Sequence, residues 1–303
     1  MRPQVTVVGS VNRDSTVEVP QFPHPGETLL GGDLAQGLGG KGANQAVAAA
    51  RLGAVTRFVG AIGVDGTDVR RQLAEAEVGI SGLVTLEDVP TGSALILVDG
   101  AAENMIVVSP GANARLAPHH LPATLLDGPG GVLLLQQEVP VDVVTEAARR
   151  ARQEGGTVVL NPAPSRPIAA ELLDAVDVLV PNQHELAALL DAPEPRGIED
   201  CRALVARLPE RIDACVTLGA DGALARSGTE IVHIPAPRVT AVDTVGSGDT
   251  FCGALGVALG NGASFTDSVT WAVRAASIAV GYRGAQGAFR GTEDLAHLGP
   301  IPV

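Results

Sequence analysis

Residues 132–161 decide the fold class, and their sequence is VLLLQQEVPVDVVTEAARRARQEGGTVVLN. Apolar runs of strand length stand at its two ends, VLLLQ at 132–136 and TVVLN at 157–161, and the segment 141–154 between them has the apolar spacing of a helix. A strand, a crossover helix and a second strand form the repeating unit of a parallel sheet that carries helices on its faces. The stretch therefore predicts an α/β fold.

The same alternation of short apolar runs and Ala-rich segments continues in both directions along the chain. Further strands are expected at residues 4–9, 57–62, 177–182 and 214–219, and further helices at 42–52, 69–76, 185–190, 200–208 and 250–259. We therefore expect a Rossmann-like, largely parallel sheet flanked by helices. In such sheets ligands bind at the carboxyl ends of the strands.

Two segments, 15–37 and 91–111, interrupt this pattern because they have little helical periodicity. They contain four strand-like runs, STVEV (15–19), ETLL (27–30), GSALILV (92–98) and NMIVVS (104–109). We expect one small β-sheet lid, although the pattern alone leaves two extra edge hairpins as an alternative. The body of the protein then comprises residues 1–14, 38–90 and 112–303.

Composition and charge exclude several classes of protein. Of the 303 residues, 46% are apolar and 18% are charged, which excludes disorder as the main state. Only 2% are aromatic and the formal net charge is −13, whereas nucleic-acid binding relies on clustered basic side chains and exposed aromatic rings. We therefore expect no nucleic-acid partner.

Cysteine usage and hydropathy indicate the compartment. Cys201, Cys215 and Cys252 are scattered without a CxxC pair, which is typical of buried thiols in a reducing compartment. No stretch reaches 18 uninterrupted apolar residues, the length that would predict a membrane span. The sequence therefore predicts a cytoplasmic protein without a membrane partner.

A glycine-rich segment, GLGGKG at 37–42, has the G-x-G-x-x-G form of a dinucleotide fingerprint. That fingerprint directly follows the first strand, whereas this segment lies well beyond it, and Asp65 further on is weak support for a ribose-binding acid. A nicotinamide-dependent oxidoreductase is therefore the weaker interpretation. The exposed N–H groups, Lys41 and Asn44 are better suited to a polyhydroxy ligand, or to an anion at a helix N-terminus.

Two other catalytic motifs are incomplete or absent. His184 and Glu185 begin an H-E-x-x-H pattern, but Ala188 stands where the second zinc ligand would be. The sequence also lacks G-x-x-x-x-G-K-[ST], so a Walker-type phosphate loop is excluded.

The segment AVDTVGSGDTFCGAL at 241–255 points to phosphoryl transfer. Gly246, Ser247 and Gly248 precede Asp249 and a helix of small residues, and consecutive N–H groups at a helix N-terminus bind anions. A carboxylate beside such an anion hole is placed to take a proton from a hydroxyl that attacks phosphorus. The alternative from this motif alone is that Asp249 is an ordinary N-cap.

A series of short motifs extends this observation along the chain. In order they are GSVNRD (9–14), GGKGANQAVAAARLGA (39–54), PTGSALILV (90–98), GAN (111–113), QQE (136–138), NPAP (161–164), PNQHE (181–185), TLGADG (217–222), DTVGSGDTF (243–251) and GAQ (284–286). In this combination and order the chain resembles the ribokinase-like family of sugar kinases over nearly its whole length. The resemblance implies an α/β body that binds nucleotide and substrate, with Asp249 as a base rather than only a cap.

The resemblance also implies a sugar site. The residues that match its hydroxyl contacts are Asn12, Asp14, Gly40, Lys41, Asn44, Glu138 and Asp249. Ala94 and Ile96 match positions that cover the sugar ring from the lid. Carboxylates and carboxamides suit vicinal hydroxyls, which both donate and accept hydrogen bonds.

For the nucleotide, the resemblance implies ATP with magnesium. Asn182 and Glu185 match the family's phosphate-and-magnesium element, with Glu185 reaching the metal through water. Thr217, Gly219 and Gly222 match the nucleotide groove, and the N–H groups of Gly246, Ser247 and Gly248 match the anion hole.

A potassium site beside the anion hole is implied as well. Asp243, the carbonyl of Val245 and Gly284 match that element. The chain departs from the family at Ala288, where ribokinase-like kinases commonly carry Ser, so one hydroxyl ligand is missing.

The expected activity is therefore ATP-dependent phosphorylation of D-ribose at O5 to D-ribose 5-phosphate and ADP. A kinase of the same family for deoxyribose, another sugar or a nucleoside is the alternative, and a non-catalytic sugar-binding protein is a rival from another class. The apolar lid strands, with ALILV and MIVV, predict a homodimer through paired lids.

Overall fold

The computed structural model describes residues 2–101, 103–128 and 130–303. Its main element is a nine-stranded sheet in the order β13-β12-β11-β10-β9-β8-β1-β4-β5. Neighbours from β11 to β5 pair in parallel, and β12 and β13 complete one edge in antiparallel pairing. The strands are β1 (Gln4–Val8), β4 (Val55–Gly63), β5 (Gly79–Leu86), β8 (Val132–Leu135), β9 (Thr157–Leu160), β10 (Val178–Leu179), β11 (Asp213–Thr217), β12 (Ala223–Ser227) and β13 (Glu230–Ile234). The largely parallel sheet confirms the predicted fold class.

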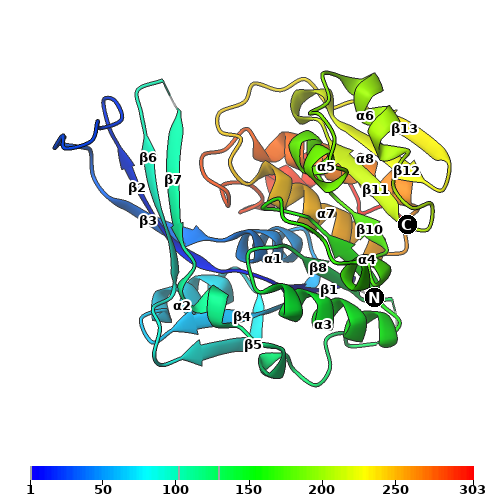
Figure 1. Ribbon diagram of the computed structural model, residues 1–303, viewed down its shortest axis with the longest axis horizontal. Coiled ribbons are helices and arrows are strands. Elements are labelled where there is room, and N and C mark those ends of the chain that lie inside the picture. The colour runs from blue at the N-terminus through cyan, green and yellow to red at the C-terminus, as the bar shows by residue number, and fades with distance from the viewer. Residues whose placement is uncertain (1, 102, 129) are drawn as a thin grey trace.

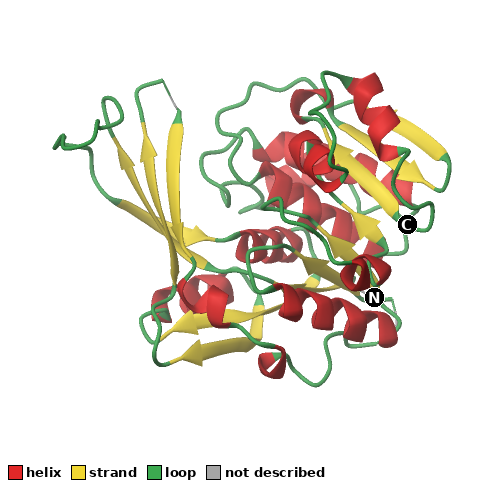
Figure 2. Cartoon of the chain, in the orientation of Figure 1, coloured by secondary structure: helices red, strands yellow, loops and turns green. Residues whose placement is uncertain are grey.

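Helices cover both faces of this sheet (Figure 2). One face carries α1 (Lys41–Arg51), α2 (Thr67–Glu75), α7 (Ser247–Gly260), α8 (Phe265–Ala279) and α9 (Thr292–Leu298). The other carries α3 (Val141–Gln153), α4 (Ala170–Asp174), α5 (Gln183–Leu189) and α6 (Ile198–Val205). Side chains of β8 pack on both faces of the sheet, because Leu134 lies in the core under the first set of helices and Leu133 and Leu135 lie in the core under the second. Short 3₁₀ turns lie at Gly111–Arg115, Pro118–His120 and Gly219–Asp221.

A second sheet of four strands stands beside the body (Figure 1). Its order is β3-β2-β6-β7, with β2 at Asn12–Glu18, β3 at Ala35–Gly39, β6 at Gly92–Val98 and β7 at Asn104–Ser109. The parallel pairing of β2 with β6 joins the two separated segments in one sheet, so the alternative of two independent edge hairpins is wrong.

The third strand of this sheet differs from the prediction. Residues 27–30 (ETLL) form no strand, and Leu30 is 93% exposed. The strand is instead AQGLG, β3, which pairs antiparallel with β2 and ends directly before α1. Glycine has a low strand propensity, so the sequence of β3 does not predict a strand. The strand forms because the N–H and C=O groups along the edge of β2 are available for pairing.

Close packing of α1 against α7 positions the site. A Cβ on Gly253 of α7 would lie 2.8 Å from the Cβ of Ala48 in α1, so only glycine permits this approach. The Ala-rich surface of α1 therefore lies directly on the small-residue surface of α7, and the first turns of the two helices come together.

Among the described residues, no helix combines the length and the apolar character that a membrane span requires.

Candidate active site

Polar residues that follow neighbouring strands gather at the carboxyl edge of the main sheet. Gln136 follows β8, Asn161 follows β9 and Asn182 lies shortly after β10. A cavity of about 110 Å³ lies at this edge. The predicted site residues that line it are Lys41, Asn182, Glu185, Thr217, Gly246, Gly248 and Asp249. The fold thus brings members of all three predicted groups, for sugar, nucleotide and catalysis, to one place.

Asp249 lies in the first turn of α7 and is only 6% exposed. Its Oδ2 accepts a hydrogen bond from Asn44 Nδ2 at 3.1 Å, and its Oδ1 accepts one from Gln45 Nε2 at 3.1 Å. Burial raises the pKa of Asp249, while Lys41 and the two amide donors oppose that rise. The carboxylate is therefore held from both oxygens and remains able to accept a proton.

Further amides orient these two donors. Gln136 Nε2 donates to Gln45 Oε1 at 2.6 Å, and Gln286 Nε2 donates to Asn44 Oδ1 at 2.9 Å. Sequence reasoning missed Gln45, Gln136 and Gln286 as members of the site. The only local signal for Gln45 was its place next to Asn44 in the GGKGANQ motif. Asn44, predicted to contact sugar, uses both ends of its amide within this network.

The N-terminus of α7 requires glycine at Gly246. Its φ is +74°, and a Cβ there would lie 2.5 Å from the Cα of Ala285. The N–H of Ser247 donates to the carbonyl of Thr244 at 3.2 Å. Within the described ranges, the N–H groups of Gly246 and Gly248 have no backbone acceptor, so these two of the three predicted donors are free for a ligand.

The carboxylate of Glu138 meets the N-terminus of α1. Its Oε2 accepts hydrogen bonds from the Ser10 hydroxyl and from the N–H of Lys41, the latter at 3.0 Å. Gly40 precedes this helix as its N-cap. The charge of Asp249 raises the pKa of the Lys41 ammonium against the effect of burial, and Glu138 and Glu185 add to the rise. Lys41 is thus a fixed positive charge among acidic neighbours.

Two residues of β2 lie beside this group. Asn12 is buried, and its Oδ1 accepts a hydrogen bond from Asn113 Nδ2 at 2.8 Å. Burial, together with the nearby charge of Glu138, raises the pKa of Asp14 to about 6. Asp14 pairs in register with Ala94 of β6, and Ala94 and Ile96 share a face of that strand.

Asn182 and Glu185 form a capping box at the start of α5. The N–H of Glu185 donates to Asn182 Oδ1 at 2.7 Å, and the N–H of Asn182 donates to Glu185 Oε2 at 2.8 Å. Burial raises the pKa of the Glu185 carboxyl. Both side chains are fixed by this box while they line the small cavity.

A larger cavity of about 520 Å³ adjoins the small one, because Thr217 and Gly248 line both. Gly219 and Gly222, predicted to form the nucleotide groove, line it together with Ser247. Apolar side chains make up much of its remaining wall: Ala236, Val239, Phe251, Val273 and Val280. This size and these mainly apolar walls are typical of a small-molecule binding site.

Asp243 ties together the two loops that were predicted to hold a cation. Its Oδ1 accepts from the N–H of Val245 at 2.9 Å, and its Oδ2 accepts from the N–H of Gly284 at 2.8 Å. The carbonyl of Ala288, at the position that lacks a hydroxyl, accepts from Arg51 Nη1 at 3.1 Å. The three predicted residues are therefore neighbours.

The dinucleotide interpretation of GLGGKG is not supported by this arrangement. Gly37 and Gly39 lie inside β3 of the small sheet rather than in a turn after β1. Asp65 is occupied by Arg13 and Thr91.

Comparison with known proteins places this site in a family. A family model described as pfkB family carbohydrate kinase matches residues 2–290. The chain is 37% identical over 293 residues to a ribokinase of Haemophilus influenzae, covering 94% of this chain and 95% of the relative. A ribokinase structure from Thermotoga maritima matches with a TM-score of 0.84 and 32% identity, covering 98% of this chain and 99% of that one. The structure of Arabidopsis thaliana ribokinase complexed with ribose and ATP matches with a TM-score of 0.86 and 31% identity, covering 98% and 99%.

The family model and the relatives match nearly the whole length of the chain. Membership of one family therefore accounts for the joint presence of a buried aspartate, an adjacent helix N-terminus and two adjoining cavities. The chain belongs to the pfkB family of carbohydrate kinases.

Proposed function

We propose that the chain transfers the γ-phosphoryl group of ATP to O5 of D-ribose, giving D-ribose 5-phosphate and ADP. The observation that carries this proposal is the buried Asp249, which lines the small polar cavity directly beside the larger, mainly apolar one. The relatives of the chain support the choice of substrates, because similar proteins are named ribokinase and the structure of the Arabidopsis thaliana ribokinase contains ribose and ATP.

Asp249 is the proposed general base. It takes the proton of the 5-hydroxyl as O5 forms a bond to the γ-phosphorus, while the bond from that phosphorus to the bridging oxygen breaks and ADP leaves. Asn44 and Gln45 hold the carboxylate at both oxygens, which keeps it oriented toward the acceptor. The raised pKa of Asp249 favours acceptance of that proton.

The free N–H groups of Gly246 and Gly248 stabilise the charge that collects on the phosphoryl oxygens during transfer. We assign the same task to Lys41, which lines the same small cavity. The sugar hydroxyls are assigned to Asn12, Asp14 and Glu138. The larger cavity holds adenine and ribose of the nucleotide.

Magnesium is proposed to bind near Asn182 and Glu185. Glu185 uses only Oε2 in the capping box, so its other oxygen is available in the small cavity, and carboxylates and water are the ligands that magnesium prefers. When bound, the ion neutralises phosphate charge. Glu185 would contact one of its water ligands.

The test of the substrate assignment is a coupled ADP-release assay over D-ribose, 2-deoxy-D-ribose, D-fructose and adenosine, each with MgATP. We expect the highest kcat/KM with D-ribose. A higher value for adenosine or another sugar would contradict the assignment of D-ribose while leaving the kinase family intact. The same preparation carrying Asp249→Asn measures background from contaminating kinases.

Potassium is proposed to activate the enzyme through the loops that Asp243 joins. A cation there would order the loop that carries Gly246 and Gly248, so the effect should appear in kcat. We expect initial rates to rise when potassium chloride is added to a buffer free of sodium and potassium, and to rise less with sodium chloride. Choline chloride is the ionic-strength control. Equal rates with potassium and choline would show that Asp243 only orders the loops.

A homodimer through the small sheets is proposed from exposed apolar side chains. Leu95 is 61% exposed, Val107 62% and Val108 51%, and β7 lies at an edge of the sheet. Light scattering should give twice the chain mass at micromolar concentration, and Val107→Lys should give the mass of one chain. A wild-type protein that scatters only as a monomer would refute the dimer.

We also propose a cytoplasmic location. Cys201, Cys215 and Cys252 are all buried free thiols, as a reducing compartment favours. The net charge of −13 supports the absence of a nucleic-acid partner.

A further inference from the structure

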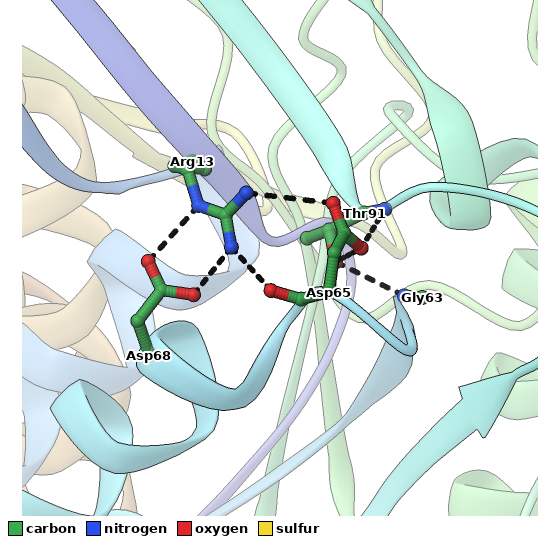
Figure 3. Close-up of polar contacts among 5 residues, drawn as sticks. All are labelled: Arg13, Gly63, Asp65, Asp68 and Thr91. Atoms are coloured by element: carbon green, nitrogen blue, oxygen red, sulfur yellow. Dashed lines mark hydrogen bonds and ion pairs between the residues drawn. The ribbon is translucent and has the colours of Figure 1, made fainter.

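The small sheet is joined to the body at its base by a network around Arg13 (Figure 3). Arg13 Nε donates to Asp68 Oδ2 at 2.9 Å, and its Nη2 donates to Asp68 Oδ1 at 2.5 Å. Nη1 donates to Asp65 Oδ2 at 3.4 Å, and Nη2 also donates to the backbone carbonyl of Asp65. Asp68 lies in the first turn of α2, so the bidentate pair connects β2 to a helix of the body.

Asp65 connects the second central strand of the small sheet to the same point. Its Oδ1 accepts hydrogen bonds from the N–H of Thr91 at 2.8 Å and from the Thr91 hydroxyl at 2.7 Å. The N–H of Gly63, at the end of β4, donates to that hydroxyl at 3.0 Å. Thr91 directly precedes β6, which pairs with β2. The beginnings of both central strands, β2 and β6, are therefore connected to the body through Asp65.

Arg13 stands between two residues that we assign to sugar binding. Alternate residues of a strand face opposite sides, so Asn12 and Asp14 share the face opposite Arg13. Asn12 has a second support in Asn113. The Asp14 side chain has less support, because its buried Oδ1 lacks a hydrogen-bond partner within the described residues. The place of the Asp14 carboxylate thus depends on the backbone of β2.

The outer part of the small sheet provides little further support for that backbone. Every residue of β7 is exposed, and most of the segment 19–34 between β2 and β3 is exposed as well. The hydrogen bond from Arg13 holds the pKa of Asp68 below its ordinary value, so the pair stays charged at neutral pH. An isolated exposed pair contributes little, but bidentate geometry and a shared network are the conditions under which such pairs matter.

We infer that Arg13 is a positioning residue for sugar binding: anchored by Asp65 and Asp68, it holds the part of β2 that carries Asn12 and Asp14 in the orientation that binds sugar hydroxyls. Arg13 lies on the opposite face of the strand and does not touch the sugar. The inference rests on the proposed function, since it takes Asp14 as a sugar ligand. Nucleotide binding lies on other elements and is independent of it.

The test compares Michaelis constants for the two substrates. Arg13→Gln should raise the KM for D-ribose about 10-fold and leave the KM for ATP within about twofold of wild type. Arg13→Lys keeps the charge but loses the bidentate geometry, so it should recover part of the lost sugar affinity. Asp68→Asn should act in the same direction, and the double variant should be no worse than the poorer single variant.

Arg152→Gln is the matched control. Arg152 donates to Asp177 at 2.8 Å and likewise joins two elements, α3 and the start of β10, but neither of these belongs to the small sheet. This variant should leave both Michaelis constants unchanged. Amide hydrogen exchange gives a second readout, in which Arg13→Gln, unlike Arg152→Gln, should lose protection at the start of β2 and β6.

Three results would overturn the inference: a lower melting temperature with an unchanged sugar KM, an equal rise of both Michaelis constants, or unchanged exchange in β2. Failure of the proposed function is distinguishable, because the wild-type protein would then not turn over D-ribose. The comparison would be repeated with the sugar that the substrate panel identifies, and hydrogen exchange applies whatever that sugar is.

Discussion

Asp249→Asn is expected to reduce kcat by roughly 10²–10⁴-fold, the usual contribution of a general base. Asn has the shape of Asp but cannot take the proton of the sugar hydroxyl. Its amide NH₂ would also face one of the two amide donors, Asn44 or Gln45, that now meet a carboxylate oxygen. We therefore expect the loss in turnover together with retained sugar binding, measured by initial rates and by calorimetric titration with D-ribose.

Asp267→Asn is the matched control for this substitution. Asp267 also lies in the first turn of a helix, α8, where its N–H donates to the Ser264 hydroxyl and its Oδ2 accepts a hydrogen bond from that hydroxyl. It lines neither of the two cavities of the site. This variant should keep wild-type kcat. Retention of more than about a tenth of wild-type turnover in Asp249→Asn would reject Asp249 as the base.

Gly246→Ala is expected to lower kcat about 100-fold, the scale on which enzymes respond to loss of one anion-hole donor. The residue has φ of +74°, and an added Cβ would meet the Cα and Cβ of Ala285 at 2.5 Å. The loop must shift to relieve this contact, which turns the N–H groups away from the phosphoryl oxygens. Stopped assays at saturating ATP and D-ribose measure the change.

Gly262→Ala separates this effect from the conformational cost alone. Gly262 follows α7 with φ of +88°, and a Cβ there would meet nothing within 4 Å. Both variants carry the cost of a left-handed alanine, about 1–2 kcal/mol in stability, but only Gly246→Ala should lose turnover. If Gly246→Ala had the same kcat as Gly262→Ala, the N–H groups at Gly246 and Gly248 would have no role in the mechanism.

Arg13 illustrates why part of the site was invisible in the sequence. The motif GSVNRD drew attention to Asn12 and Asp14 because amide and carboxylate side chains suit sugar hydroxyls. Nothing local distinguishes Arg13 from a solvated charge. Its partners Asp65 and Asp68 are more than fifty residues away, and only the folding of α2 against the base of β2 brings them within reach.

The sequence by itself determined the α/β class, the parallel order of strand and helix, and the place of Asp249 after a glycine turn. These are local properties, since apolar runs, glycine turns and the start of a helix depend on residues that are close in the chain. Residues 35–39 have low strand propensity, so β3 was not predicted from the sequence. It forms because backbone pairing with β2 overrides side-chain preference.

Only the tertiary structure decided how Asp249 is held. Gln45 and Asn44 reach it because Gly253 lets α1 lie directly on α7, and Gln136 and Gln286 come from two further parts of the chain to orient those amides. Hydrogen bonds act over about 3 Å and take no account of distance along the chain. Partners more than two hundred residues apart therefore become specific only once the helices have packed.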